Sequence, residues 1–186
     1  ISIGILHKGK LLGGAIYAPD VLGGFAVWGQ REKEVMTFWP QEGISIVSDI
    51  PKELPLKDAM VVIGQDIFFV DYFKRFKNFL EILGPQVRMI NTASSCALSL
   101  AQVITGQKSV YIQIPSGPWD WAAGIPLLKT VGGKVNFFRL QDGKLNFLTG
   151  DPEISDYNPD KKTLGFIGGI PSVVDEITAQ IMKHIE

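Results

Sequence analysis

Short apolar segments and amphipathic helical segments alternate along most of this chain. Residues 59–64 (AMVVIG) form a short apolar run of the kind found in strands buried on both faces. Residues 66–83 follow with apolar side chains at helical spacing and charged side chains on the other side. The order strand, helix, strand then continues through residues 87–90, 94–104, 109–114, 119–131, 134–140, 163–169 and 171–185. This order predicts an α/β sheet with helices packed against it.

The first 50 residues have a different pattern. Ile1, Ile3 and Ile5 alternate with Ser2, Gly4 and Leu6 in the manner of a strand, and residues 7–10 (HKGK) have the composition of a tight turn. We therefore expect a hairpin over residues 1–18. Three further short strands are expected at residues 25–29, 34–39 and 43–49. The α/β part is thus expected to be preceded by antiparallel hairpin strands.

The length of the chain limits its organisation. A chain of 186 residues with 46% hydrophobic side chains can bury one core, and it is too short for two ordinary domains with a linker. We expect residues 1–186 to be a single domain or a fragment, with hairpin strands in 1–50 and the alternating part in 58–186. The chain starts inside a strand pattern and without methionine, which favours a fragment.

Charge and cysteine content exclude several classes of function. The net charge is -1, from 18 basic and 19 acidic residues, so we expect neither nucleic acid nor an anionic membrane as a partner. No apolar run reaches the ~18 residues that a membrane span needs. The single cysteine, Cys96, is expected to be a buried structural thiol and fits a cytoplasmic location. His7 and His184, the only histidines, lie far apart in the sequence.

Asp120 lies in the unusual stretch GPWDWAAG, at or just inside the start of a predicted helix. One interpretation is an N-cap, in which the carboxylate accepts hydrogen bonds from the first backbone N–H groups of that helix. The other is a metal ligand, because α/β sheets bind their ligands at the carboxyl ends of the strands and carboxylates bind hard cations. Local sequence leaves both open. The small residues that follow Asp120 would let this helix pack closely on a neighbour.

A longer stretch resembles a known family. Six features of this stretch follow the order and spacing of the C-terminal half of the inositol monophosphatase family. They are Arg88, the segment 91–94, Gly106, the strand 109–114, WDWAAG and the Gly-Gly pair at 132–133. The family has an arginine, a GSAA-type segment, a glycine, a strand, WDxAAG and EAGG there. The hairpin at residues 1–20 also resembles the segment after the family's DPxDGT motif. The resemblance implies a layered αβαβα sandwich.

The resemblance also implies an activity and a site. Family members are Mg2+-dependent phosphomonoesterases, in which two or more ions activate water and stabilise the leaving alkoxide. Asp120 matches the family's aspartate that binds the second metal ion. Asn91, Thr92 and Ala93 match the segment that lines the sugar or inositol site. Gln113 matches a position occupied by an inositol-binding glutamate. The expected partner is therefore a small phosphorylated substrate, and a homodimer is possible because family members are often dimers.

This sequence departs from the family pattern in three ways. Asn91 replaces a glycine, and Gln113 offers an amide in place of a carboxylate. The DPxDGT motif and the acidic pair before it are absent from the 186 residues. Because Mg2+ needs several oxygen ligands, Asp120 alone would not hold it, and most ligands are expected from a missing N-terminal half. No catalytic residue is therefore assigned within the chain, and the chain alone is expected to be inactive.

Three hypotheses follow. The first is the C-terminal portion of a Mg2+-dependent phosphatase that hydrolyses a phosphate monoester of a sugar, inositol or nucleotide. The second is a degenerate, non-catalytic family member that binds a phosphorylated ligand or a protein partner. The third is an unrelated α/β binding domain in which Asp120 is only a cap.

Overall fold

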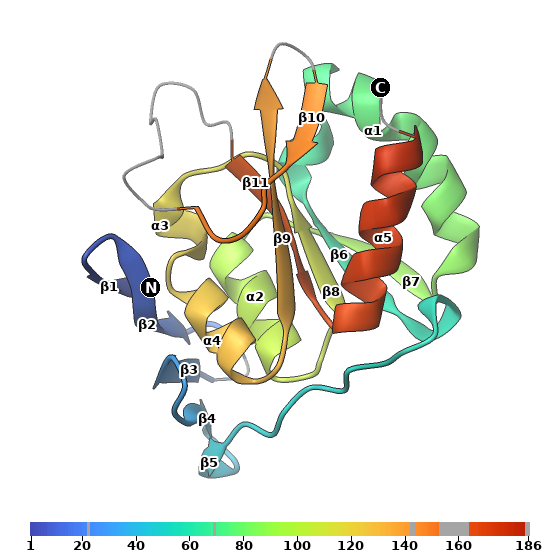
Figure 1. Cartoon of the computed structure of the whole chain (residues 1–186). Helices are drawn as coiled ribbons and strands as arrows, with labels where there is room; N and C mark the ends of the chain where they lie inside the picture. Colours follow the sequence, from blue (N-terminus) through green and yellow to red (C-terminus); the bar gives the residue numbers. More distant parts are fainter. Residues whose placement is uncertain (22, 69, 142–143, 153–163, 185–186) are drawn as a thin grey trace.

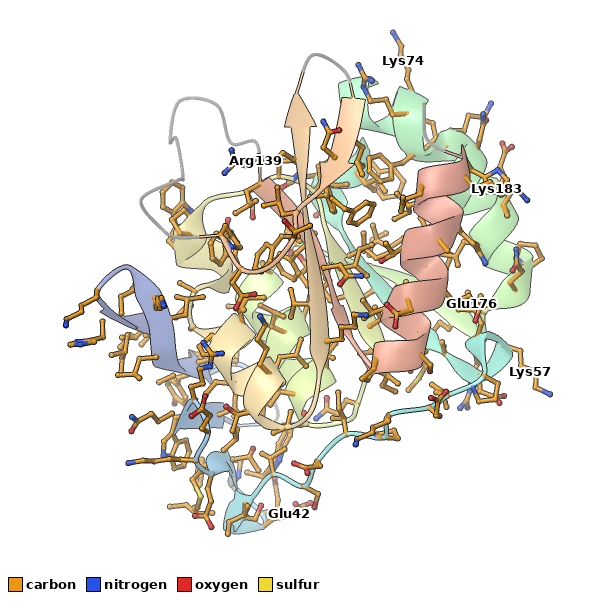
Figure 2. The ribbon with its side chains drawn as sticks, viewed as in Figure 1. Glu42, Lys57, Lys74, Arg139, Glu176 and Lys183 are labelled. Carbon is orange, nitrogen blue, oxygen red and sulfur yellow. The ribbon has the colours of Figure 1, made fainter. Side chains whose placement is uncertain are left out.

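The computed structural model describes residues 1–21, 23–68, 70–141, 144–152 and 164–184. Within these ranges two β-sheets enclose one layer of helices, and a second layer of helices covers the outer face of the larger sheet (Figure 1). The charged side chains of Lys57, Lys74 and Lys183 extend outward from the edge of this assembly (Figure 2). No helix in the described part of the chain is long and apolar enough to cross a membrane.

The smaller sheet is an antiparallel meander of five strands in chain order. Its first turn has Lys8 at φ 49° and Gly9 at φ 77°, and His7 pairs with Lys10. Two positive φ angles in a two-residue loop match the twist of a hairpin, so the predicted hairpin is confirmed. The strands are β1 (Ser2–His7), β2 (Lys10–Ala18), β3 (Phe25–Gln30), β4 (Val35–Trp39) and β5 (Gly43–Ile46).

The larger sheet has six strands in the order β10-β9-β11-β8-β6-β7. β6 pairs in parallel with both β7 and β8, and the remaining pairs are antiparallel. The carboxyl ends of β6, β7 and β8 therefore meet at one edge of the sheet. The strands are β6 (Met60–Gly64), β7 (Met89–Ala93), β8 (Val110–Gln113), β9 (Lys134–Gln141), β10 (Lys144–Phe147) and β11 (Leu164–Gly169).

Helices fill the space between the sheets and cover one outer face. α2 (Cys96–Ile104), α3 (Pro118–Trp121) and α4 (Gly124–Thr130) lie between the two sheets. α1 (Val70–Leu83) and α5 (Pro171–His184) cover the far face of the larger sheet (Figure 1). Three single turns of 3-10 helix complete the description: Leu56–Asp58, Gln65–Phe68 and Gly84–Gln86.

The predicted helix over residues 119–131 is in fact two helices, α3 and α4. The backbone stays in the helical region at Ala122 (φ -60°, ψ -28°) and at Ala123 (φ -72°, ψ -46°), so the chain does not turn away. Pro126 lies four residues after Ala122 and has no N–H to donate to the Ala122 carbonyl. Loss of this hydrogen bond ends α3 and starts α4.

A row of three glycines holds the α3–α4 junction against the smaller sheet. Gly4, Gly14 and Gly29 lie opposite one another on β1, β2 and β3. A Cβ atom on Gly4 would lie 2.8 Å from the Ala122 Cβ, and one on Gly14 would lie 2.5 Å from the Ala123 carbonyl oxygen. The small residues of WDWAAG and the glycine row therefore fit each other, which confirms the predicted close packing.

The other side of the junction faces the core. A Cβ atom on Gly124 would lie 2.6 Å from a methyl carbon of Leu100, so α4 also packs closely on α2. Trp121 is 1% exposed, and its ring meets that of Phe137 edge to face at 5.7 Å. Asp120 is thus held in place by two neighbours with little freedom to move: the buried Trp121 and the tightly packed Ala122.

Candidate functional site

A pocket of about 410 Å³ lies at the edge where the parallel strands end. β6 ends at Gly64, β7 at Ala93 and β8 at Gln113, and each of these residues lines the pocket. Ligand sites of open α/β sheets lie at this edge because the loops that leave the strands diverge there. The lining residues are Gly64, Gln65, Asp66, Phe68, Ala93, Ser94, Cys96, Tyr111, Gln113 and Asp120.

Asp120 reaches the pocket from the first turn of α3. The N-cap of α3 is Gly117, which makes no side-chain capping hydrogen bond, and Pro118 is the first helical residue. Asp120 is therefore the third residue of the helix, and the interpretation of Asp120 as an N-cap is wrong. Pro118 causes the difference, because its fixed φ and missing N–H suit the first helical position. The half-buried carboxylate lines the pocket.

Gln113 is 3% exposed and is held by two hydrogen bonds. Its Nε2 donates to the Ile114 carbonyl at 2.8 Å, and its Oε1 accepts from the Tyr111 hydroxyl. These bonds fix the orientation of the amide. A primary amide has two N–H donors and an oxygen with two lone pairs, so one donor and one lone pair remain for a ligand.

Asn91, Thr92 and Ala93 lie on β7, and only Ala93 lines the pocket. The pocket is at the carboxyl end of the strand, so residues earlier in β7 lie too far back to reach it. The side-chain amide of Asn91 has hydrogen-bond partners within the protein. Its nitrogen donates to the Ile90 carbonyl at 3.2 Å, and its oxygen accepts from Lys108 Nζ at 3.0 Å. Thr92 lies on the opposite face of the strand from Ala93. The geometry therefore gives no support to substrate contacts by Asn91 or Thr92.

Sequence reasoning missed Asp66 and Tyr111 and placed Ser94 outside the binding set. Asp66 lies two residues after the end of β6, in a 3-10 turn, and Ser94 directly follows β7. Polar residues just after a parallel strand are the signal that would have found both. Tyr111 lies inside a buried strand, and the sequence alone does not distinguish a tyrosine that lines a pocket from one that is packed in the core.

Cys96 is 8% exposed at the start of α2, which confirms the predicted buried thiol. Burial raises the pKa of the Cys96 thiol well above its ordinary value, and it does the same to the pKa of the neighbouring Tyr111 hydroxyl. A protonated thiol is a poor nucleophile. Cys96 therefore lines the pocket and is expected to stay protonated near neutral pH.

The state of Cys96 gives a testable prediction. We expect a disulfide reagent such as dithionitrobenzoate to label the native protein at pH 8 at least about 100-fold more slowly than the urea-unfolded chain, because labelling requires the thiolate. The measurement is absorbance of the released thiolate with time. Equal rates for native and unfolded protein would show that Cys96 is accessible and ionised.

The described residues do not contain a complete metal centre. No group of three or more His, Cys, Asp or Glu side chains among them is arranged to hold an ion. Asp66 and Asp120 bring two carboxylates to one pocket, and Gln113 adds an amide oxygen. Mg2+ prefers six oxygen ligands in octahedral geometry. These side chains fit part of such a centre and do not suffice for all of it.

Comparison with known proteins decides the family. The family model "Inositol monophosphatase family" matches residues 1–166. The chain belongs to the inositol monophosphatase family. The family resemblance carried by WDWAAG and the segments around it is therefore confirmed, and the unrelated binding domain is excluded.

Relatives and structural neighbours agree with this assignment. The inositol-1-monophosphatase of Bacillus subtilis is 35% identical over 137 residues, which cover 72% of this chain and 47% of that protein. The fructose-1,6-bisphosphatase/inositol-1-monophosphatase of Thermotoga maritima is 25% identical over 140 residues, 74% of this chain and 48% of that protein. Mycobacterium tuberculosis SuhB superposes with a TM-score of 0.74 at 19% identity and covers 98% of this chain and 63% of its own.

The structural match confirms the predicted fold class, that of the inositol monophosphatase sandwich. The chain spans about half the length of the curated relatives that it matches.

Proposed function

We propose that these 186 residues form the substrate-binding portion of a Mg2+-dependent phosphatase that hydrolyses a phosphate monoester of a sugar, inositol or nucleotide. The observation that carries the proposal is the pocket at the strand ends, in which Asp120 lies with Asp66 and the oriented amide of Gln113. Family membership and the phosphatase names of two relatives support it.

Asp120 is proposed as a carboxylate ligand of one Mg2+ ion. Its place on a rigid junction suits this role, because Trp121 is buried and Ala122 packs on Gly4. The remaining oxygen ligands are proposed to come from outside the 186 residues, since the pocket supplies too few. The chain alone is therefore expected to be inactive.

The rest of the pocket is proposed to bind the hydroxyl-bearing part of the substrate. Gln113, Tyr111 and Ser94 offer neutral donors and acceptors, and Asp66 can accept from a hydroxyl. The described lining residues include no Lys, Arg or His. A second phosphate group would find no cation among them, so a polyhydroxylated ring suits this pocket better than a second phosphate.

The test measures phosphate release from inositol 1-phosphate with and without Mg2+. The 186-residue chain alone is expected to show none. When the chain is co-expressed with the part of the B. subtilis relative that has no counterpart here, activity is expected, and Asp120→Asn is expected to lower it at least about 100-fold through loss of a metal ligand. The matched control is Asp175→Asn, which changes an exposed carboxylate on α5 that pairs with Lys134 at 2.5 Å.

Two outcomes would contradict the proposal. Mg2+-dependent release by the chain alone, abolished by Asp120→Asn, would show that the described site is sufficient. Full activity of the reconstituted Asp120→Asn variant would remove Asp120 from the metal centre.

A second candidate function is a non-catalytic member that binds a phosphorylated ligand or a protein partner. It is favoured by Gln113, which is uncharged and makes hydrogen bonds within the protein through both the nitrogen and the oxygen of its amide. Binding of inositol 1-phosphate to the reconstituted protein, without turnover in Mg2+ or Mn2+, would support it.

Three further expectations stay predictions: a cytoplasmic location, a homodimer, and the description of residues 1–186 as a single domain or fragment.

A further inference from the structure

A second pocket, of about 260 Å³, lies between the smaller sheet, α4 and β9. Its walls come from the start of β2, the turn between β3 and β4, one side of α4, and β9 (Figure 1). It shares no lining residue with the pocket that Asp120 lines. We call it the cationic pocket, because Lys10, Arg31 and Lys129 line it and Asp151 is the one carboxylate among its described lining residues.

A bulge in β2 and a backbone hydrogen bond bring two of these cations together. The register of β1 and β2 shifts between Ile5 and Leu6, and Leu12 is left without a partner on β1. A bulge of this kind redirects the side chains next to it. The backbone N–H of Arg31 donates to the Leu12 carbonyl at 2.7 Å, which holds the β3–β4 turn beside the start of β2. Lys10 and Arg31 therefore line the same pocket.

Most of the hydrogen-bonding capacity of the three cations is unused. Lys129 pairs with Asp151, which takes one of the three N–H donors of the ammonium group. Arg31 lies 3.6 Å from Glu32, which does not line the pocket, and no carboxylate of the described residues lies within ion-pair distance of Lys10. Three cations against one carboxylate leave a surplus of two positive charges in a chain whose net charge is -1.

The inner wall of the cationic pocket is apolar. Ile125 is 1% exposed and Phe137 is 2% exposed, and Pro126 between them is buried, so the core fixes all three side chains. Leu11 packs against the same core from β2. An apolar wall with a few charged groups at its edge is the usual form of a site for a small organic ligand.

We propose that the cationic pocket binds a small organic phosphate that carries an apolar group, and that it does so without Mg2+. Two surplus positive charges match a dianion, and the planar fork of an arginine matches the oxygens of a phosphate. The pocket at the strand ends differs, because its described lining has two carboxylates and no cation. This second site goes beyond the proposed function and does not depend on it.

The cationic pocket lies on the same helical junction as the candidate active site. Ile125 and Pro126 begin α4 within six residues of Asp120 on α3. A ligand in the pocket would contact α4, β2 and β9 together, and it would hold α4 against both sheets. We therefore expect the ligand to raise the temperature of thermal unfolding, as any molecule does that binds only the folded state.

The experiment titrates phenylphosphonate into the 186-residue chain by isothermal titration calorimetry, at pH 8 and low salt with EDTA present. Phenylphosphonate is an aromatic dianion whose carbon–phosphorus bond a phosphatase does not cleave. We expect one site per chain. Inorganic phosphate is expected to bind at least about tenfold more weakly, because it has no apolar group to bury.

Two variants locate the site. Lys10→Gln with Arg31→Gln should raise the Kd for phenylphosphonate at least about tenfold, because two charge-assisted hydrogen bonds are lost. The matched control is Lys57→Gln with Lys74→Gln, which changes the net charge equally at two lysines that extend outward on other elements (Figure 2).

Asp151→Asn should lower the Kd at least about threefold, because it removes the carboxylate that competes with the ligand for Lys129. Its control is Asp175→Asn, which changes the carboxylate paired with Lys134 on α5.

Equal effects of the two lysine-containing double variants would show that only the total charge matters, and would overturn the proposal. Inorganic phosphate that binds as tightly as phenylphosphonate, or an Asp151→Asn variant whose Kd does not fall, would also overturn it. So would absence of binding to a chain that is folded by circular dichroism. Binding with the expected variant effects, together with an inactive reconstituted enzyme, would uphold this site and count against the proposed function.

Discussion

Trp121→Ala is expected to lower the free energy of unfolding by about 3–5 kcal/mol, the range for removing a large buried aromatic side chain. Trp121 is 1% exposed, and its ring packs edge to face on Phe137 of β9, between α3 and the larger sheet. The cavity cannot close easily, because the Ala122 backbone is held against Gly4 and Leu100 packs on Gly124.

Urea unfolding followed by circular dichroism measures this change. The matched control is Trp119→Ala, two residues earlier, where the same indole is removed from a side chain that is 60% exposed. This control is expected to cost less than about 1 kcal/mol, as for most surface substitutions. A similar loss for both variants would mean that Trp121 is not the core anchor of α3.

Gly14→Val is expected to destabilise the protein by about 3 kcal/mol, at the upper end of the cost of overpacking. A Cβ atom at this position would lie 2.5 Å from the Ala123 carbonyl oxygen and 2.6 Å from the Ala123 Cα. Both atoms belong to the backbone, so the clash can be relieved only if α3 and α4 move away from β2. The same urea titration measures the effect.

The control for Gly14→Val is Gly84→Val. A Cβ atom on Gly84 would meet nothing within 4 Å, so the side chain has room. We expect a change below about 1 kcal/mol there. If Gly14→Val were equally mild, the close contact between β2 and Ala123 would not contribute to the packing of the two layers.

Much of the fold could be predicted from the pattern of apolar residues. The burial of β6 follows from its continuous apolar run, and the first hairpin follows from Lys8-Gly9. The break between α3 and α4 was missed because WDWAAGIPLLKTV is periodic throughout. Only Pro126, four residues after Ala122, indicates it.

The candidate site could be predicted only in part. Asp120, Gln113 and Ala93 line the pocket, whereas Asn91 and Thr92 do not. A sequence motif gives the order of its residues, but it does not give the distance of each residue from the end of its strand. The pocket lies at the strand ends, so this distance decides which residues line it. Asp66 was missed for a different reason: its place in the same pocket as Asp120 comes from the parallel pairing of β6 with β8, which the residue pattern alone does not give.

The glycine row has a consequence for how the smaller sheet forms. If β1 slipped by one residue in either direction, Ile3 or Ile5 would replace Gly4 against Ala122. Neither isoleucine leaves room for the α3–α4 junction in its observed position. The correct register of β1 is therefore favoured by a segment far downstream in the sequence, because Ala122 fits only against a glycine. The register of β1 is therefore expected to be fixed only after that segment has docked.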